Sequence, residues 1–159
     1  QKVRLFGTMT AEENVLVAAR SHERSHSRAL IATTEALDIA GFRAERRTPV
    51  SALALADRKR VEIARGIAAR PKLLLLDEMM NGLTPDESDA LTASIKGLPA
   101  EGITVMLVEH VIQVVRSLCD RLVVLHHGQL IAEGAPSDVL ARDDVAEAWL
   151  GRAEKKRSK

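Results

Sequence analysis

Two adjacent carboxylates stand directly after an apolar run in this sequence. Asp77 and Glu78 follow the leucines of 73–76, a segment with the length and composition of a buried strand. Such a strand places both acids at the carboxyl end of a parallel sheet, where open α/β proteins bind ligands. There the first acid can hold Mg²⁺, directly or through water, and the second can orient and deprotonate a water that attacks a phosphoryl group. The alternative interpretation is that the two acids only end the strand.

A second apolar segment ends in a similar way. Residues 103–108 repeat the strand pattern and are followed by Glu109 and His110. If the two strands are neighbours in the sheet, His110 lies beside the acidic pair, where an imidazole can hydrogen-bond a terminal phosphate or its attacking water. A histidine that stands alone at a strand end is more often a polar cap. Its combination with Asp77 and Glu78 favours a phosphoryl-transfer site.

The segments around these strands predict the elements that position them. Between the strands, Thr84-Pro85-Asp86-Glu87 has the form of a capping box with proline at the first helical position, which predicts a helix to about Lys96. Strand, helix and strand then form a βαβ unit, and the apolar runs are typical of parallel strands covered on both faces. Residues 121–125 and 129–133 predict a further strand and the second arm of a hairpin. The fold class is therefore α/β.

The remaining patterns predict helices on either side of this core. A second capping box, Thr10-Ala11-Glu12-Glu13, opens the first of them. Further helices are predicted over 28–40, from Asp57 to about Arg70, from His110 to Leu118, and from Pro136 and Asp143.

The composition excludes several classes of protein. The chain has 159 residues, enough for one domain, and its 23 basic and 22 acidic side chains leave a formal charge of +1. Aromatic residues make up 2%, so a binder that stacks bases lacks its platforms, and we expect no nucleic acid partner. The single cysteine, Cys119, cannot form an internal disulfide. No apolar run approaches the roughly 20 residues of a membrane-spanning helix.

Two basic runs could contact phosphates or anionic lipid, but such runs are usually solvated. They are Arg58-Lys59-Arg60 and Lys155-Lys156-Arg157. His22 and His26 have a spacing that could bind a metal, but no carboxylate or thiol completes a known pattern. We therefore predict solvated surface at all of these positions.

The ordered set of motifs resembles the nucleotide-binding subunits of ATP-binding cassette (ABC) transporters. It looks closest to the ATPase subunits of branched-chain amino-acid importers. The resemblance covers nearly the whole chain and is carried by residues 1–6, 10–17, 61–65, 107–110 and 128–134. It implies a partial P-loop NTPase core with a mostly parallel sheet, together with an α-helical subdomain. The implied organisation is one cassette domain, with a helical subdomain at about 8–70, the Walker B to switch half of the core at 71–135, and C-terminal helices with a basic tail at 136–159.

The resemblance also implies roles for individual residues. Gln1 resembles the Q-loop glutamine, which reaches the Mg²⁺ and the water and reports to the membrane subunit. Asp77 looks like the Walker B aspartate, which holds the metal, Glu78 like the catalytic base and His110 like the switch histidine. The implied cofactors are ATP and Mg²⁺, and the implied partners are an ABC permease membrane subunit and a second ATP-binding subunit. The implied location is cytoplasmic, peripheral on the inner face of the cell membrane.

Two departures from the family pattern bear on catalysis. The phosphate-binding loop Gly-x-x-x-x-Gly-Lys-Ser/Thr and the adenine-stacking aromatic, which precede the Q-loop in the family, do not occur in this sequence. The signature motif, whose residues meet the nucleotide, aligns with Leu53-Ala54-Leu55-Ala56-Asp57. There Ala54 has no hydroxyl to offer a γ-phosphate, and Ala56 places a Cβ where glycine lets the backbone approach. We therefore expect a truncated cassette that, alone, binds Mg-ATP weakly if at all and does not hydrolyse it.

Two functions stay open at this point. The first is the C-terminal portion of an ATP-binding subunit that couples ATP hydrolysis to solute import. The resemblance implies that the imported solutes are branched-chain amino acids. Asp77, Glu78 and His110 favour it. The second is a non-catalytic interaction module that docks on a membrane subunit, which the missing phosphate loop and the altered signature favour.

Overall fold

The computed structural model describes residues 5–150. The chain divides after Glu109 into two compact units. Within the described residues, no helix is both long enough and apolar enough to cross a membrane.

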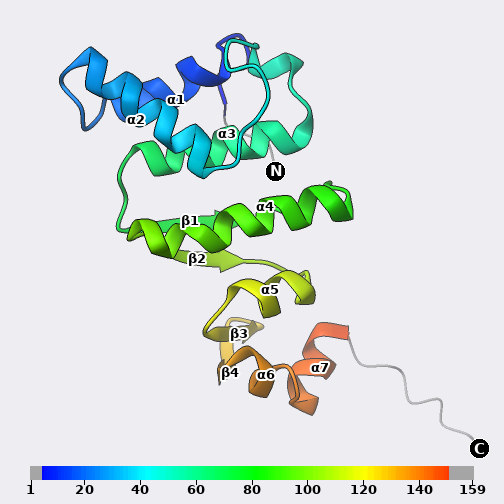
Figure 1. Cartoon of the computed structure of the whole chain (residues 1–159). Helices are drawn as coiled ribbons and strands as arrows, with labels where there is room; N and C mark the ends of the chain where they lie inside the picture. The colour runs from blue at the N-terminus through cyan, green and yellow to red at the C-terminus, as the bar shows by residue number, and fades with distance from the viewer. Residues whose placement is uncertain (1–4, 151–159) are drawn as a thin grey trace, which may run out of the picture. The chain divides into compact units, whose positions relative to one another are not determined.

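The first unit begins with helices that pack against one another (Figure 1). They are α1 (Ala11–Ala19), α2 (His26–Ile39) and α3 (Leu55–Ala68), with the short 3₁₀ helix η1 (Val50–Ala52) before α3. The capping box at the start of α1 is confirmed: the Thr10 hydroxyl accepts from the Glu13 N–H at 3.1 Å, and the Glu13 carboxylate accepts from the Thr10 N–H at 2.8 Å. α2 ends before Gly41, whose φ of 72° is the left-handed conformation that closes a helix.

An apolar core joins these three helices. Its fully buried side chains include Val15, Leu37, Phe42, Val61 and Ile63. Alternating small residues, such as Ala29, Ala36 and Ala64, are also buried and let the helices approach closely.

A parallel two-stranded sheet completes the first unit. β1 (Leu73–Asp77) and β2 (Thr104–Val108) pair in parallel, with Leu73 opposite Thr104 and Asp77 opposite Val108. The crossover between them consists of α4 (Pro85–Gly97) and the 3₁₀ helix η2 (Leu98–Glu101), and Figure 1 shows α4 running along the strands. The predicted βαβ unit is therefore confirmed.

Within residues 5–109, the sheet is covered on one face only, which departs from the expectation of two covered faces. Leu76 is buried, and Leu74 lies against α3, where a Cβ added at Gly66 would stand 2.6 Å from Leu74 Cδ1. The alternate side chains are exposed apolar groups: Leu73, Leu75, Met106 and Val108. We call these four residues the open face. An apolar run indicates that both faces of a strand avoid water, and among the described residues of this unit helices lie on only one of them.

The second unit is a hairpin with short helices. α5 (Ile112–Leu118) precedes β3 (Leu122–His126) and β4 (Gln129–Gly134), which pair antiparallel as predicted, and α6 (Pro136–Val139) and α7 (Asp143–Leu150) follow. His127 and Gly128 have φ values of 47° and 78°, as the tight turn of a two-residue hairpin requires. Its core consists of Val124, Ala132, Val139 and Val145.

Candidate functional site

The predicted acidic pair lies at the carboxyl end of β1. Asp77 is the last residue of the strand and is exposed. Glu78 is half-buried, and its N–H donates to the Val108 carbonyl at 2.9 Å, so the hydrogen-bonding ladder to β2 extends one residue past the strand. Its φ of 47° is left-handed, which is uncommon for a residue with a side chain and turns the backbone sharply away from the sheet. Both carboxylates therefore stand at the edge where open α/β sheets bind ligands.

A tight turn follows Glu78 and leads into α4. The Asn81 N–H donates to the Glu78 carbonyl at 3.3 Å, and the Leu83 N–H donates to the Met80 carbonyl at 3.2 Å. The side chains of Met79 and Met80 are buried, so the turn is anchored in the core of the unit. We call residues 78–83 the acidic turn.

The acidic turn ends at a well-capped helix. The Thr84 N–H donates to the Glu87 carboxylate at 2.9 Å, and the Glu87 N–H donates to the Thr84 hydroxyl at 3.4 Å, so the second predicted capping box is confirmed. Hydrogen bonds from the Thr84 N–H and then from its hydroxyl lower the pKa of Glu87. Thr84 therefore acts as the cap of α4.

Glu109 takes part in this arrangement although the sequence analysis assigned it no role. Its carboxylate accepts a hydrogen bond from the Met80 N–H at 2.9 Å, across 29 positions in the chain. The sequence pattern that indicates such a role is the position of Glu109 directly after the second apolar run, since that run forms the strand next to the one that carries the acids. Glu109 thus fixes the acidic turn from β2.

The other predicted residues are described to different extents. His110 is exposed and begins the second unit, two positions after the end of β2. The condition for its predicted position, that β1 and β2 are neighbours, is met. Gln1 lies outside the described residues. The roles of Gln1 and His110 stay predictions.

The segment aligned with the signature motif forms the start of α3. Ala54 is the N-cap residue, and its side chain forms no capping hydrogen bond. Ala56 is buried in the first turn, and the Asp57 carboxylate accepts from the Arg60 guanidinium at 3.0 Å. This helix start therefore lacks the hydroxyl that a serine cap supplies to the first amides.

The basic run at the start of α3 is not a solvated surface, so that prediction is wrong. The Arg58 guanidinium donates to the carbonyls of Leu53 and Ser51, each at 2.8 Å. Lys59 is only 8% exposed. Helical periodicity explains this burial, because Lys59 shares a face with Ala56 and Ile63, three and four positions away, and that face is buried.

Burial also changes the protonation behaviour of Lys59. Loss of water around the ammonium group lowers its pKa, and the carboxylates of Glu62 and Glu109 act in the opposite direction. The second basic run, Lys155-Lys156-Arg157, lies outside the described residues. His22 and His26 are exposed, as predicted.

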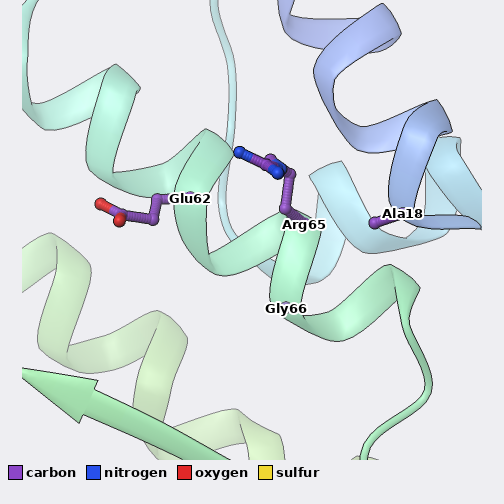
Figure 2. Close-up of a pocket in the computed structure, with 4 residues that line it drawn as sticks. All are labelled: Ala18, Glu62, Arg65 and Gly66. Carbon is purple, nitrogen blue, oxygen red and sulfur yellow. The ribbon is translucent and has the colours of Figure 1, made fainter. Parts of the chain in front are cut away.

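A pocket of about 300 Å³ lies between α1 and α3. Figure 2 shows its lining, with Ala18 on α1 and Glu62, Arg65 and Gly66 on α3. The Arg65 guanidinium stands 5.3 Å from the centroid of the Phe6 ring, within cation–π distance. The pocket is separate from the acidic turn and is lined by one acid, one base and small residues.

The acidic pair has the donor chemistry of a magnesium site. Mg²⁺ in nucleotide-binding proteins is held by one or two carboxylates, with water and substrate phosphates as its other ligands. Asp77 and Glu78 supply such oxygens. Over residues 5–150, no group of three or more His, Cys, Asp or Glu side chains is arranged to hold a metal ion.

Comparison with known proteins identifies the family. The profile described as "ABC transporter" matches residues 1–81. The chain belongs to the ABC transporter family. The family resemblance and the α/β fold class read from the sequence are thereby confirmed.

Relatives and a solved structure of the family extend over most of the chain. The high-affinity branched-chain amino acid transport ATP-binding protein BraF of Pseudomonas aeruginosa is 37% identical over 96% of this chain. LivG of Escherichia coli, with the same description, is 34% identical over 96% of this chain. The chain spans 66% of the length of each. Among structures, cbiO1 of Clostridium perfringens, described as part of the ABC transporter complex cbiONQ, is 28% identical with a TM-score of 0.79, over 89% of this chain and 57% of that one.

Proposed function

We propose that this chain is the C-terminal portion of an ATP-binding subunit that couples ATP hydrolysis to solute import through an ABC transporter. One observation carries the proposal. Asp77 and Glu78 stand at the carboxyl end of a parallel strand, and the backbone after them is bonded to the neighbouring strand. Membership of the ABC transporter family agrees with phosphoryl transfer at such an edge.

The residues of the site take distinct roles in this proposal. Asp77 holds the metal, and Glu78 orients and deprotonates the attacking water. His110 contacts the terminal phosphate or its attacking water, and Gln1 contacts the metal and the water. Mg²⁺ bound with ATP neutralises charge on the phosphates. Asp77 ends the extended strand and Glu78 has a left-handed backbone, so the two acids stand on differently shaped backbone, which agrees with separate roles for them.

The start of α3 would meet the nucleotide of a second ATP-binding subunit. Backbone amides at a helix N-terminus attract anions, and the contacts of Ala54, Ala56 and Asp57 in this proposal are with that nucleotide. Because Ala54 supplies no hydroxyl, we expect weaker γ-phosphate binding than with serine.

The segment from Thr10 to Ala40, with residues 1–6 beside it, would dock on the permease. Its exposed apolar groups include Phe6, Val17 and Ile31, which the unit does not bury. The buried Asn14 fixes this surface, because its amide donates to the Phe6 and Thr10 carbonyls at 3.0 and 2.9 Å and accepts from the Phe6 N–H at 2.9 Å. Such docking would hold the protein peripherally at the cytoplasmic, inner face of the cell membrane. Deletion of Thr10 to Ala40 should abolish co-purification with a permease, and unchanged binding would remove this assignment.

The solute class and the domain organisation belong to the same proposal. The names of BraF and LivG support branched-chain amino acids as the imported solute. The proposed cassette consists of a helical subdomain at about 8–70, a core half at 71–135, and C-terminal helices with a basic tail at 136–159.

A non-catalytic interaction module is the second candidate. The observation that favours it is the start of α3, where Ala54 leaves the helix without a side-chain cap in the segment aligned with the signature motif.

The decisive experiment compares the 159-residue chain with a cassette completed by an upstream half that carries the phosphate loop. Calorimetry should detect little or no Mg-ATP binding to the chain alone, and micromolar affinity would refute that expectation. In the completed cassette, Glu78→Gln should lower hydrolysis by ~10² to 10⁴ while leaving ATP binding largely intact. Glu101→Gln, a change at an exposed acid in η2, is the matched control. Undiminished hydrolysis with Glu78→Gln would overturn the role of Glu78, and a completed cassette that binds no ATP would favour the interaction module.

A further inference from the structure

The acidic turn leaves β1 while its backbone is still hydrogen-bonded to β2. Asp77, the last residue of β1, stands opposite Val108, and the Glu78 N–H donates to the Val108 carbonyl at 2.9 Å. Every second residue of a strand donates toward the same neighbour, so in a regular parallel ladder the next donor would be the Met80 N–H. The left-handed φ of 47° at Glu78 bends the chain before that donor is reached.

A side chain of β2's end holds this next donor. The Met80 N–H donates to the Glu109 carboxylate at 2.9 Å, and Glu109 directly follows Val108, whose carbonyl holds the preceding donor. Met80 is only 5% exposed, and a backbone donor at a buried position needs an acceptor. A carboxylate forms a stronger bond to it than a neutral acceptor does. Glu109 therefore adds one side-chain rung to the ladder, past the point where the backbone turns.

The two rungs bracket the residue that the proposed function makes the general base. The first rung is formed by the Glu78 N–H itself and joins main chain to main chain, so it does not depend on the side chains. The second rung is formed two positions later and depends on one side chain, that of Glu109. The backbone from which the Glu78 carboxylate projects is thus fixed on its far side by the length and the oxygen of residue 109.

We propose that Glu109 is a positioning residue, which holds Glu78 in place for catalysis through the Met80 N–H and does not contact the substrate. This inference deepens the proposed function, on which it rests for the catalytic role of Glu78. It requires an oxygen at the distance of a glutamate carboxylate from the β2 backbone. A metal ligand or a second general base would instead require the charge of residue 109, so the two requirements can be separated by substitution.

Hydrogen exchange of the Met80 amide in the 159-residue chain tests the rung without nucleotide. Glu109→Ala should speed this exchange by roughly tenfold or more, because the acceptor is lost. Glu109→Gln, which keeps an oxygen at the same length, should stay within about threefold of the unaltered chain. Glu109→Asp keeps the charge but is one methylene shorter, so it should resemble Glu109→Ala.

Two controls accompany these variants. The Val61 amide, buried in α3, reports in each of them that the fold is intact. Glu101→Ala removes an exposed acid in η2 and should change Met80 exchange by less than about twofold. If Glu109→Ala unfolds the chain, the comparison of Glu109→Gln with Glu109→Asp decides the test. Equal exchange of Met80 in these two variants would overturn the rung.

Hydrolysis by the completed cassette tests what the rung does. Glu109→Ala and Glu109→Asp should lower kcat by roughly tenfold or more while ATP affinity stays within about twofold, because a misplaced base slows the chemical step alone. Glu109→Gln should keep most of the kcat. The opposite order, with Asp active and Gln inactive, would show that residue 109 acts through its charge and would overturn the proposal. Equal losses of kcat and of ATP affinity in all three variants would also overturn it, because they indicate a general structural role.

Failure of this inference is distinguishable from failure of the proposed function. If Glu78→Gln leaves hydrolysis undiminished, the proposed function fails, and the exchange rates of Met80 still report on the rung. If Glu78→Gln stops hydrolysis and Met80 exchange does not distinguish Gln from Asp at position 109, the function stands and the positioning role is removed.

Discussion

The two faces of the β1–β2 sheet are built from the same kind of residue but have different surroundings. Leu76 points toward the helices and is 6% exposed, whereas its neighbour Leu75 points the other way and is 66% exposed. The open face continues across Met106 and Val108 of β2. Apolar side chains therefore line both faces, and the covering elements make the difference between them.

This contrast teaches which part of the strands stabilises the unit and which part is available for contact. The covered face gains free energy from removing apolar surface from water. The open face gains less within the described residues, because its side chains stay between 51% and 66% exposed, and contiguous exposed apolar patches mark interaction surfaces or association hazards. Substitutions at Leu76 and Leu75, which are adjacent in the chain, can therefore distinguish effects on stability from effects on self-association.

The largest expected effect follows from the covered face. Leu76→Ala should lower the free energy of unfolding by about 2 to 5 kcal/mol, because it removes buried methyl groups and leaves a cavity. Leu75→Ala should change it by less than about 1 kcal/mol, as is usual for surface positions. Urea unfolding followed by circular dichroism measures both. Equal losses in the two variants would break the contrast between the faces.

The open face should control self-association. We expect the 159-residue chain to associate at tens of micromolar, by rough order of magnitude, because the exposed sheet offers apolar side chains and unpaired strand edges. Leu75→Lys should shift sedimentation toward the monomer by placing a charge in the middle of the face. A compact, cooperative monomer of the unaltered chain at these concentrations would contradict the prediction.

A smaller effect is expected at the crossover helix between the two strands. Thr84→Ala removes the hydroxyl that caps α4 and should cost roughly 1 kcal/mol of unfolding free energy. Thr34→Ala, at an exposed position inside α2, is the control and should be neutral or slightly stabilising, because alanine has the higher helix propensity. The same urea measurement applies, and an equal response at both threonines would show that the cap contributes nothing.

The smallest effect concerns pH. Hydrogen bonds from their capping threonines lower the pKa values of Glu13 and Glu87 below the ordinary 4.5. A carboxylate with a lowered pKa in the folded state stabilises the fold above its unfolded pKa, and this contribution is lost as pH falls through the folded value. The urea concentration at the unfolding midpoint should therefore decrease as the pH is lowered from about 5 to about 3, and Thr84→Ala should make this decrease smaller. An identical pH profile in this variant would remove Glu87 as a contributor.

The sequence by itself determined the local elements of this protein. Thr10 with Glu13 and Thr84 with Glu87 cap helices through partners three residues away, so the pattern contains the whole interaction. The hairpin around Gly128 and the crossover from β1 to β2 follow from equally short-range patterns. The position of the acidic pair at the end of a parallel strand was predicted for the same reason, because it depends only on what directly follows the strand.

Tertiary structure alone decided the rest. The burial of Lys59 depends on which face of α3 the other helices cover, and the bond from Met80 to Glu109 joins residues 29 positions apart. Leu75 is exposed because no element among the described residues covers its face of the sheet, whereas the neighbouring Leu76, also a leucine, is buried. In each case the side chain's environment is set by segments distant in the chain, and residue type and spacing carry no information about where such segments come to lie.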